Sequence, residues 1–228
     1  MIKKLFAIFV SFSALTISTA NAQNGELGVE YFRDGQNNII RAGSYTDVEG
    51  TPFLYKTWMP GTATAADGKV YDNLKLNYNL LDDVLLFKYD SEDKEMKFEK
   101  DIVSFNVKLP VQATYANRYP EIDKQTAATY YEVLSSNGKT ALLKYSGKTI
   151  NAVKNYDATV TKKFQDITAY YVFKNGKMQK LNKSKDSVLN VLADKKDQLQ
   201  TYVKTNPVNF KKDEDLARVF DYYNTLAL

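Results

Sequence analysis

The sequence of 228 residues contains no histidine and no cysteine. These two absences exclude several classes of site, because structural zinc centres use Cys and His ligands and the common Ser and Cys nucleophiles use an imidazole base. Without cysteine the chain also lacks disulfides, covalent haem motifs and thiol redox centres. A titration switch near neutral pH would require a shifted carboxylate or lysine. The chemistry that remains is carboxylate, Ser-Lys or tyrosine chemistry, oxygen-ligated metals, and binding without catalysis.

The first 22 residues have the pattern of a secretory signal peptide. Residues 1–4 give a positive start, residues 5–20 are mostly apolar, and Ala20-Asn21-Ala22 has the small residues of a cleavage site. Cleavage after Ala22 would lower the net charge from +4 to +2, because the segment carries two lysines and no acid. We expect an exported protein in the periplasm, associated with the outer membrane, or extracellular. A mature chain so close to neutral gives no reason to expect a nucleic-acid partner, and it has no further apolar run long enough for a membrane span.

Apolar and polar side chains alternate with a period of two through much of residues 51–109, which predicts half-buried β-strands. In the run 73–79, for example, Leu74, Leu76 and Tyr78 alternate with polar residues. The runs with strand character are 73–79, 84–89, 96–98 and 103–109. Short acidic stretches separate them, so we expect an antiparallel meander with short connections.

Glycine pairs predict the turns that follow. Asn137-Gly138 and Asn175-Gly176 each lie between apolar runs, the strongest short-range signal for a hairpin. Gly147-Lys148 repeats the Gly-Lys pair found at both of these positions. We therefore expect a turn at Gly147 as well, with glycine supplying a positive φ.

From about residue 183 the apolar period becomes helical. Ser184 and Asp194 are the predicted caps of two short helices. A third helix is indicated by the i, i+3, i+4, i+7 spacing of Leu216, Val219, Phe220 and Tyr223. The predicted fold class is mainly β (α+β): an antiparallel sheet, curved or half-barrel-like, followed by about three short C-terminal helices. We expect residues 23–228 to form a single β-rich domain with this C-terminal helical segment.

Several different short motifs are spread along most of the chain after residue 22. They are Gly50–Tyr55, Asp67-Gly68 with Tyr71, Leu76–Asn79 with Asp82-Asp83, Tyr131–Leu134, Leu142–Lys144, Lys183–Lys185, Lys195-Lys196, Asp215-Leu216 and Tyr222–Asn224. Together they resemble a group of uncharacterised secreted proteins of Gram-negative bacteria. The resemblance implies an envelope or extracellular location, and it implies neither a catalytic residue nor a ligand.

The candidates for catalysis and metal binding are few. Gly138-Lys139 and Gly147-Lys148 have Val133 and Leu142 where a phosphate loop needs glycine. The acids at 82, 83 and 90–95 have the oxygens that calcium prefers, but their position between strands and the interleaved lysines favour solvated turns. Asp101 and Glu132 are the acids to inspect for a paired-carboxylate hydrolase, although a charge on the solvent face is the plainer interpretation. We expect neither a metal nor a cofactor.

Tyrosine is the most abundant aromatic residue, with 17 copies against 12 Phe and one Trp. Its apolar ring and polar hydroxyl suit a surface groove as well as the boundary of a core. The candidate binding residues are Trp58, Tyr55, Tyr130 and Tyr170. Trp58 is the first choice for a partly exposed ring, because it lies just before Pro60-Gly61.

Three functions are compatible with these observations. The favoured one is a non-catalytic exported protein that binds an envelope protein, a glycan or an apolar ligand through an aromatic-rich face. The alternatives are a carboxylate-dependent hydrolase of an envelope or extracellular polymer, and a periplasmic carrier of an apolar ligand. The hydrolase predicts two facing acids in a pocket, one with a raised pKa. The carrier predicts an apolar cavity of about 300 Å³ or more, and the binding protein predicts an exposed aromatic patch.

Overall fold

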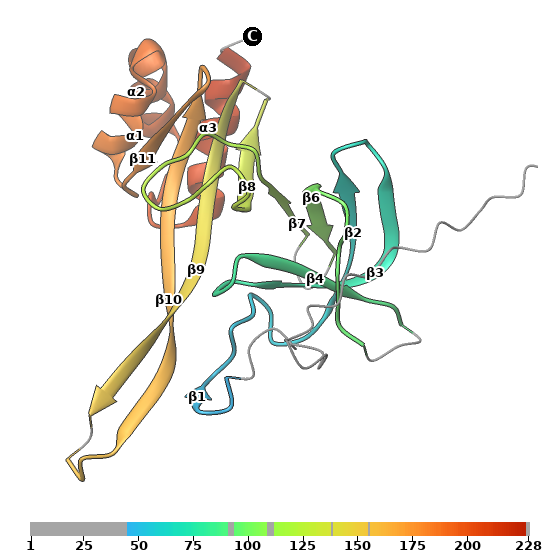
Figure 1. Cartoon of the computed structure of the whole chain (residues 1–228). Coiled ribbons are helices and arrows are strands. Elements are labelled where there is room, and N and C mark those ends of the chain that lie inside the picture. Colours follow the sequence, from blue (N-terminus) through green and yellow to red (C-terminus); the bar gives the residue numbers. More distant parts are fainter. Residues whose placement is uncertain (1–44, 91–93, 109–111, 138, 155, 227–228) are drawn as a thin grey trace, which may run out of the picture.

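The computed structural model describes residues 45–90, 94–108, 112–137, 139–154 and 156–226 (Figure 1). The predicted signal peptide lies outside these residues. The strands are β1 (Val48–Glu49), β2 (Met59–Ala65), β3 (Val70–Asn79), β4 (Val84–Lys88), β5 (Met96–Lys97), β6 (Ile102–Val107), β7 (Ala113–Ala116), β8 (Tyr131–Ser136), β9 (Thr140–Lys154), β10 (Val160–Lys174) and β11 (Lys177–Leu181). The helices are α1 (Lys185–Val191), α2 (Lys196–Thr205) and α3 (Asp213–Leu226), with a 3₁₀ turn at Ala193–Lys195.

All the described strands belong to one open, mixed sheet. Its order is β1-β10-β9-β8-β7-β6-β2-β3-β4-β5, and β11 pairs with β10. Every pair is antiparallel except β1 with β10, in which Val48 lies opposite Lys162 in a parallel register. The predicted antiparallel arrangement is therefore mostly right. It fails at β1 because this strand has two residues and a partner more than 100 positions away, so neither periodicity nor a hairpin turn fixes its direction.

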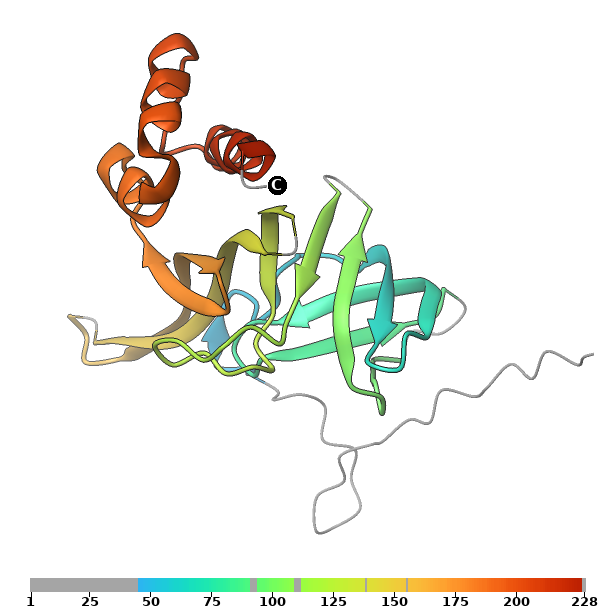
Figure 2. The ribbon, with the colours of Figure 1, turned by 90° about the horizontal axis from the view of Figure 1, so that it is seen from above.

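Strands β2 to β7 curve around a first hydrophobic core (Figure 2). The expected alternation in β3 is confirmed for Leu74, Leu76 and Tyr78, which are all buried. The polar positions Asn77 and Asn79 are buried as well, with 3% and 0% of their surface exposed. Asn77 Nδ2 donates to the Tyr55 carbonyl oxygen at 3.0 Å, and Asn79 Oδ1 accepts the N–H groups of the turn that follows. Their amides satisfy loop backbone that would otherwise be left unpaired.

Strands β9 and β10 form a hairpin of two 15-residue strands paired along their whole length. The half nearest the helices is part of the body, whereas residues 148–167 project from it (Figure 1). We call residues 148–167 the arm. The predicted turn at Gly147 is wrong, because Gly147 lies within β9 opposite Ile167. A Cβ atom at Gly147 would lie 2.4 Å from Tyr145 Oη, so the glycine leaves room for a ring that folds over the strand.

The Asn-Gly turn between β10 and β11 is confirmed. Asn175 and Gly176 have φ angles of 51° and 75°, which a type I′ turn requires at both central positions. At the β8–β9 turn, Gly138 lies outside the described residues. Asn137 Oδ1 there accepts the N–H groups of Lys139 and Thr140 at 3.0 and 2.9 Å.

The three helices pack together with β8 and β9 around a second core (Figures 1 and 2). Ser184 caps α1 as predicted, since its side chain accepts the Ser187 N–H. Asp194 lies in the 3₁₀ turn and does not cap α2; its carboxylate instead accepts from Tyr223 and from Lys174. The predicted apolar face of α3, Leu216, Val219, Phe220 and Tyr223, is buried. Within the described part of the chain, no helix combines the length and apolar character of a membrane span.

Candidate functional site

The four predicted binding rings lie in different environments. Tyr130 is 8% exposed, and its hydroxyl donates to the Ile102 carbonyl oxygen at 2.5 Å. Burial, followed by the charges of Asp101 and Asp83, raises the pKa of Tyr130. Tyr130 is therefore largely buried against the first core, and it also lines the pocket described below.

Tyr55 and Trp58 belong to the segment between β1 and β2. The Tyr55 hydroxyl lies 2.9 Å from the Tyr115 hydroxyl, and the ring is half-buried. Trp58 is partly exposed, with the Phe53 ring at 6.3 Å and Lys88 Nζ 5.2 Å from the indole centroid. Tyr55 and Tyr170 are partly exposed as well, so exposure does not set Trp58 apart from them.

Tyr170 belongs to an ionic group that sequence reasoning did not assemble. We call it the Asp213 cluster; it consists of Glu132, Lys144, Tyr170, Lys183 and Asp213 and joins the sheet to the first residue of α3. Lys144 Nζ lies 2.9 Å from Asp213 Oδ2 and 3.3 Å from Glu132 Oε2. Lys183 Nζ and the Tyr170 hydroxyl both contact Asp213 Oδ1, at 2.5 and 2.8 Å.

The electrostatics of this cluster indicate a structural role. Burial alone would raise the pKa of Asp213, but hydrogen bonds from Lys183, Lys144 and Tyr170 lower it. Burial alone would likewise lower the pKa of Lys144, but its bond to Asp213 and the charge of Glu132 raise it. Both groups are therefore held in their charged forms, so neither is available to transfer a proton near neutral pH.

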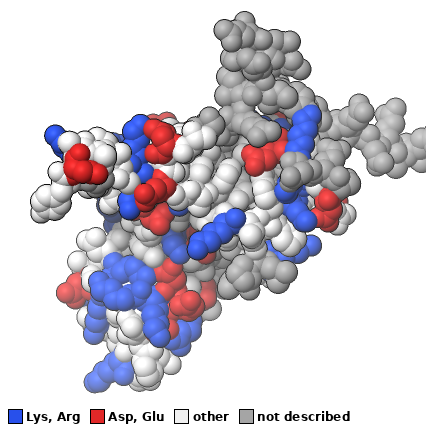
Figure 3. All heavy atoms as spheres, turned by 90° about the horizontal axis from the view of Figure 1, so that it is seen from below, with Lys and Arg blue, Asp and Glu red and all other residues white. Residues whose placement is uncertain are grey.

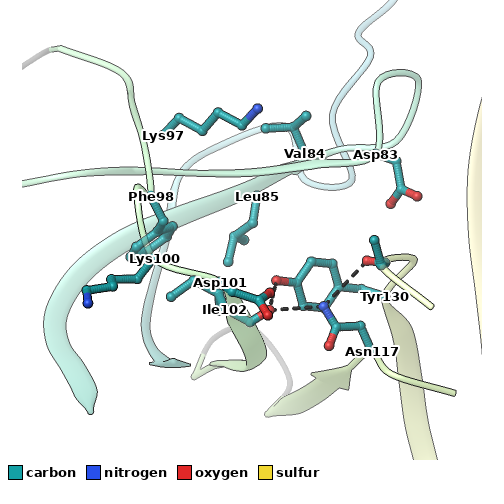
Figure 4. Close-up of a pocket in the computed structure, with 11 residues that line it drawn as sticks. Asp83, Val84, Leu85, Lys97, Phe98, Lys100, Asp101, Ile102, Asn117 and Tyr130 are labelled. Atoms are coloured by element: carbon teal, nitrogen blue, oxygen red, sulfur yellow. Dashed lines mark hydrogen bonds between the residues drawn. The ribbon is translucent and has the colours of Figure 1, made fainter. Parts of the chain in front are cut away.

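A pocket of about 190 Å³ lies beside β4 and the segment before β6 (Figure 4). Asp83 and Asp101 both line it, as the hydrolase alternative would require. Each carboxylate is already engaged: Asp101 pairs with Arg118 at 2.6 Å, and Asp83 accepts from the hydroxyls of Thr129, at 2.7 Å, and Tyr78.

Three further observations bear on the hydrolase and the carrier. Where the pKa of a described carboxyl group departs clearly from its usual value, as in Asp194 and Asp213, it is lowered, the opposite of a general acid. The pocket is also smaller than the cavity of about 300 Å³ expected of a carrier. Within residues 45–226, leaving out the undescribed positions, no three acidic side chains are arranged to hold a metal ion.

Most of the exposed large apolar residues of the described chain are on the arm. Six large apolar residues of the described chain are exposed, and five of them are on the arm: Ile150, Val153, Tyr156, Val160 and Ile167. The sixth, Val70, is in β3. Exposed apolar residues scattered singly over a surface are normal, whereas these lie together on one projecting element. Ile150 and Val160 are on one face of the hairpin, and Val153 and Ile167 are on the other. The sequence has apolar residues on both sides of residues 155–159, but Tyr156 is the one aromatic among the five, so a prediction based on aromatic residues does not include them.

The arm also has an open strand edge. Strand β8 pairs with β9 only as far as Lys144, and beyond it the Lys148 N–H donates outward to the Leu80 carbonyl oxygen at 3.2 Å. Because alternate residues of an antiparallel strand point their N–H and C=O groups to the same side, those of Ile150, Ala152 and Lys154 also point away from β10. No described strand pairs with this edge. Comparison with protein-family models, curated proteins and solved structures finds no match for the chain.

Proposed function

We propose that the chain is an exported, non-catalytic protein that binds a partner protein through its arm. The observation that supports this most directly is the concentration of exposed apolar side chains on residues 148–167, beside an unpaired strand edge. Unpaired edges are usually blocked by charge or proline. Between Lys148 and Lys154 the five residues 149–153 contain neither, so this stretch of the edge is suited to receive a further strand.

The binding mode we propose is strand addition. An extended segment of the partner pairs with the outward backbone groups of Ile150, Ala152 and Lys154, and its side chains cover the apolar residues of the arm. A protein segment fits this surface better than a polyanion, because three of the four arm lysines are already neutralised within the molecule. Lys162 and Lys163 pair with acids of the β1 region at 2.6 and 2.8 Å, and Lys148 pairs with Asp166 at 3.2 Å.

The decisive variant is Ala152→Pro. Proline at this position removes one outward N–H and leaves the hydrogen bonds between β9 and β10 in place, since the Ala152 N–H is not part of that ladder. The exported protein is used to capture partners from envelope extract, and a captured partner is then purified and its affinity measured. We expect Ala152→Pro and Val153→Ser each to weaken binding at least about tenfold.

Val70→Ser is the matched control, because it removes an exposed apolar side chain away from the arm. Circular dichroism and thermal unfolding show whether each variant is folded. A partner bound equally by the wild type, Ala152→Pro and Val153→Ser would refute the arm as the binding surface. Trp58→Ala in the same assay tests the aromatic face predicted from the sequence.

The pocket that contains Asp83 and Asp101 favours the hydrolase as a second candidate. Hydrolysis requires one carboxyl group to donate a proton to the leaving group. The other carboxylate must act as the nucleophile or activate the attacking water. If envelope polymers are cleaved by the wild type and not by Asp101→Asn, this second candidate replaces the first. Asp67→Asn, at an exposed turn, is the control for loss of an acid elsewhere.

A further inference from the structure

The nearly neutral total charge conceals an uneven distribution. Residues 174–212 carry ten lysines and three acids, whereas residues 45–90 carry four lysines and seven acids. The basic stretch includes β11, α1, α2 and the loop before α3. Viewed from below, basic side chains gather over this helical end of the molecule (Figure 3).

Most of these lysines have no acidic partner in the described part of the chain. Three are paired: Lys174 with Asp194, Lys180 with Asp123 and Lys183 with Asp213. The other seven form no ion pair within 4.0 Å with any described residue, and six of them are exposed while Lys195 is half-buried. We call these seven the lysine surface: Lys177, Lys185, Lys195, Lys196, Lys204, Lys211 and Lys212.

The chemistry of the lysine surface points to an extended anionic partner. It contains lysine and no arginine, so it offers point charges and lacks the planar fork that recognises an individual phosphate or base. The charges are spread along two helices, a strand and a loop, so they suit a broad surface better than a small ligand. Nearby aromatic rings are occupied, since Tyr202 stacks on Tyr222 at 4.3 Å, and single-stranded nucleic acid would need free rings on which bases stack.

We propose that the lysine surface docks the protein onto a membrane surface that carries anionic phospholipid headgroups. The apolar faces of α1 and α2 are turned inward, with Leu189 and Leu199 buried in the second core. The helices therefore adsorb through charge and do not insert. This contact is independent of the arm, which is at the other end of the β9–β10 hairpin (Figure 1).

The test is co-sedimentation of the exported protein with vesicles of phosphatidylcholine containing 30% phosphatidylglycerol or none. We expect binding to the anionic vesicles alone, and weaker binding as salt increases. Each lysine near an anionic surface contributes about fivefold in affinity, so the combined change Lys185→Gln, Lys195→Gln, Lys196→Gln and Lys204→Gln should weaken binding at least about 100-fold. The corresponding change to arginine should preserve it.

A matched control makes the same change in net charge elsewhere. Lys56, Lys108, Lys124 and Lys139 are all exposed and outside the lysine surface; replacing these four by Gln should leave vesicle binding within about threefold of wild type. Equal losses in the two combined variants would overturn the proposal, because only net charge would then matter. Binding to DNA or polyphosphate without binding to anionic vesicles would also overturn it. Ala152→Pro should bind vesicles as the wild type does, so failure of the arm as a partner site would leave this result unaffected.

Discussion

The two halves of the β9–β10 hairpin share one ladder but differ in almost everything else. In the inner half, Leu142 and Val172 are fully buried against the helices, and Leu143 and Tyr171 are buried on the opposite face. In the arm, Ile150 and Val153 are 36% and 48% exposed. The backbone pairing is continuous from one half to the other. Alternating apolar residues therefore predict a strand. Whether their side chains are buried depends on which other elements pack against that strand.

The largest expected effect contrasts two residues on the same face of β9. Leu142→Ala should lower the free energy of unfolding by about 3 kcal/mol, because it leaves a cavity in the second core. Ile150→Ala, eight residues along the strand, should lower it by only about 1 kcal/mol or less, because the side chain is already 36% exposed. Urea denaturation of the two variants measures both values. Equal losses would mean that the arm is covered as well as the body is, and the contrast would disappear.

A smaller effect is expected at the Asp213 cluster, which fixes α3 to the inner half. Asp213→Asn should lower the free energy of unfolding by about 2 kcal/mol at pH 7, since Lys144 and Lys183 lose a shared, largely buried partner. The lowered pKa of Asp213 means that its contribution is present above the ordinary carboxyl pKa of about 3.9 and is lost as the pH falls through the lower folded-state value. The difference between wild type and variant should therefore shrink below about pH 4.

The control for Asp213 is Glu214→Gln at the same helix end, where the side chain is exposed. Glu214→Gln should lower the free energy of unfolding by less than about 1 kcal/mol at any pH, because an exposed charge near a helix terminus contributes about 0.3–1 kcal/mol. A loss at Asp213→Asn that stays constant from pH 7 to pH 2 would contradict the ionic account. Such a result would assign the effect to packing of the side chain.

At the junction of the two halves, Gly147→Ala tests why the strand can continue into the arm. The new Cβ would approach the Tyr145 ring to 2.4–3.0 Å, so the ring must move, at an expected cost of about 1 kcal/mol. In a Tyr145→Leu background, Gly147→Ala should hardly change the free energy of unfolding, because the ring that the new Cβ would crowd is absent. A double-mutant cycle measures this coupling, and a coupling near zero would refute the role assigned to the ring.

Much of the inner structure could be predicted from the sequence, because local chemistry and tertiary structure agree there. The period of β3, the Asn175-Gly176 turn and the apolar face of α3 all depend on neighbouring residues. The failures have tertiary causes. Gly147 resembles the other Gly-Lys turns in sequence, but the Tyr145 ring and the pairing with β10 keep it in a strand. Asp194 does not cap α2, because its carboxylate is bound to Lys174 and Tyr223.

The candidate site was harder to predict than the fold. A tyrosine in the sequence does not reveal whether its ring is covered, so Tyr130 was a candidate beside Tyr55 and Tyr170 although it is only 8% exposed. The Asp213 cluster draws residues from positions 132 to 213, a separation that no motif spans. The exposed residues of the arm have the same apolar character as those of the core, and one sequence does not distinguish them.

The smallest expected effect on stability, and the sharpest test of the contrast, is at the end of the arm. Tyr156 is fully exposed and Val153 is 48% exposed, so the double change Val153→Ser and Tyr156→Ser mainly removes apolar surface that faces solvent. The free energy of unfolding should stay within about 0.5 kcal/mol of wild type in urea denaturation, while partner binding should fall at least about tenfold. A destabilisation above about 1 kcal/mol would show that another part of the same molecule covers these side chains. The arm would then be a second packed region, and its apolar residues would need no partner to explain them.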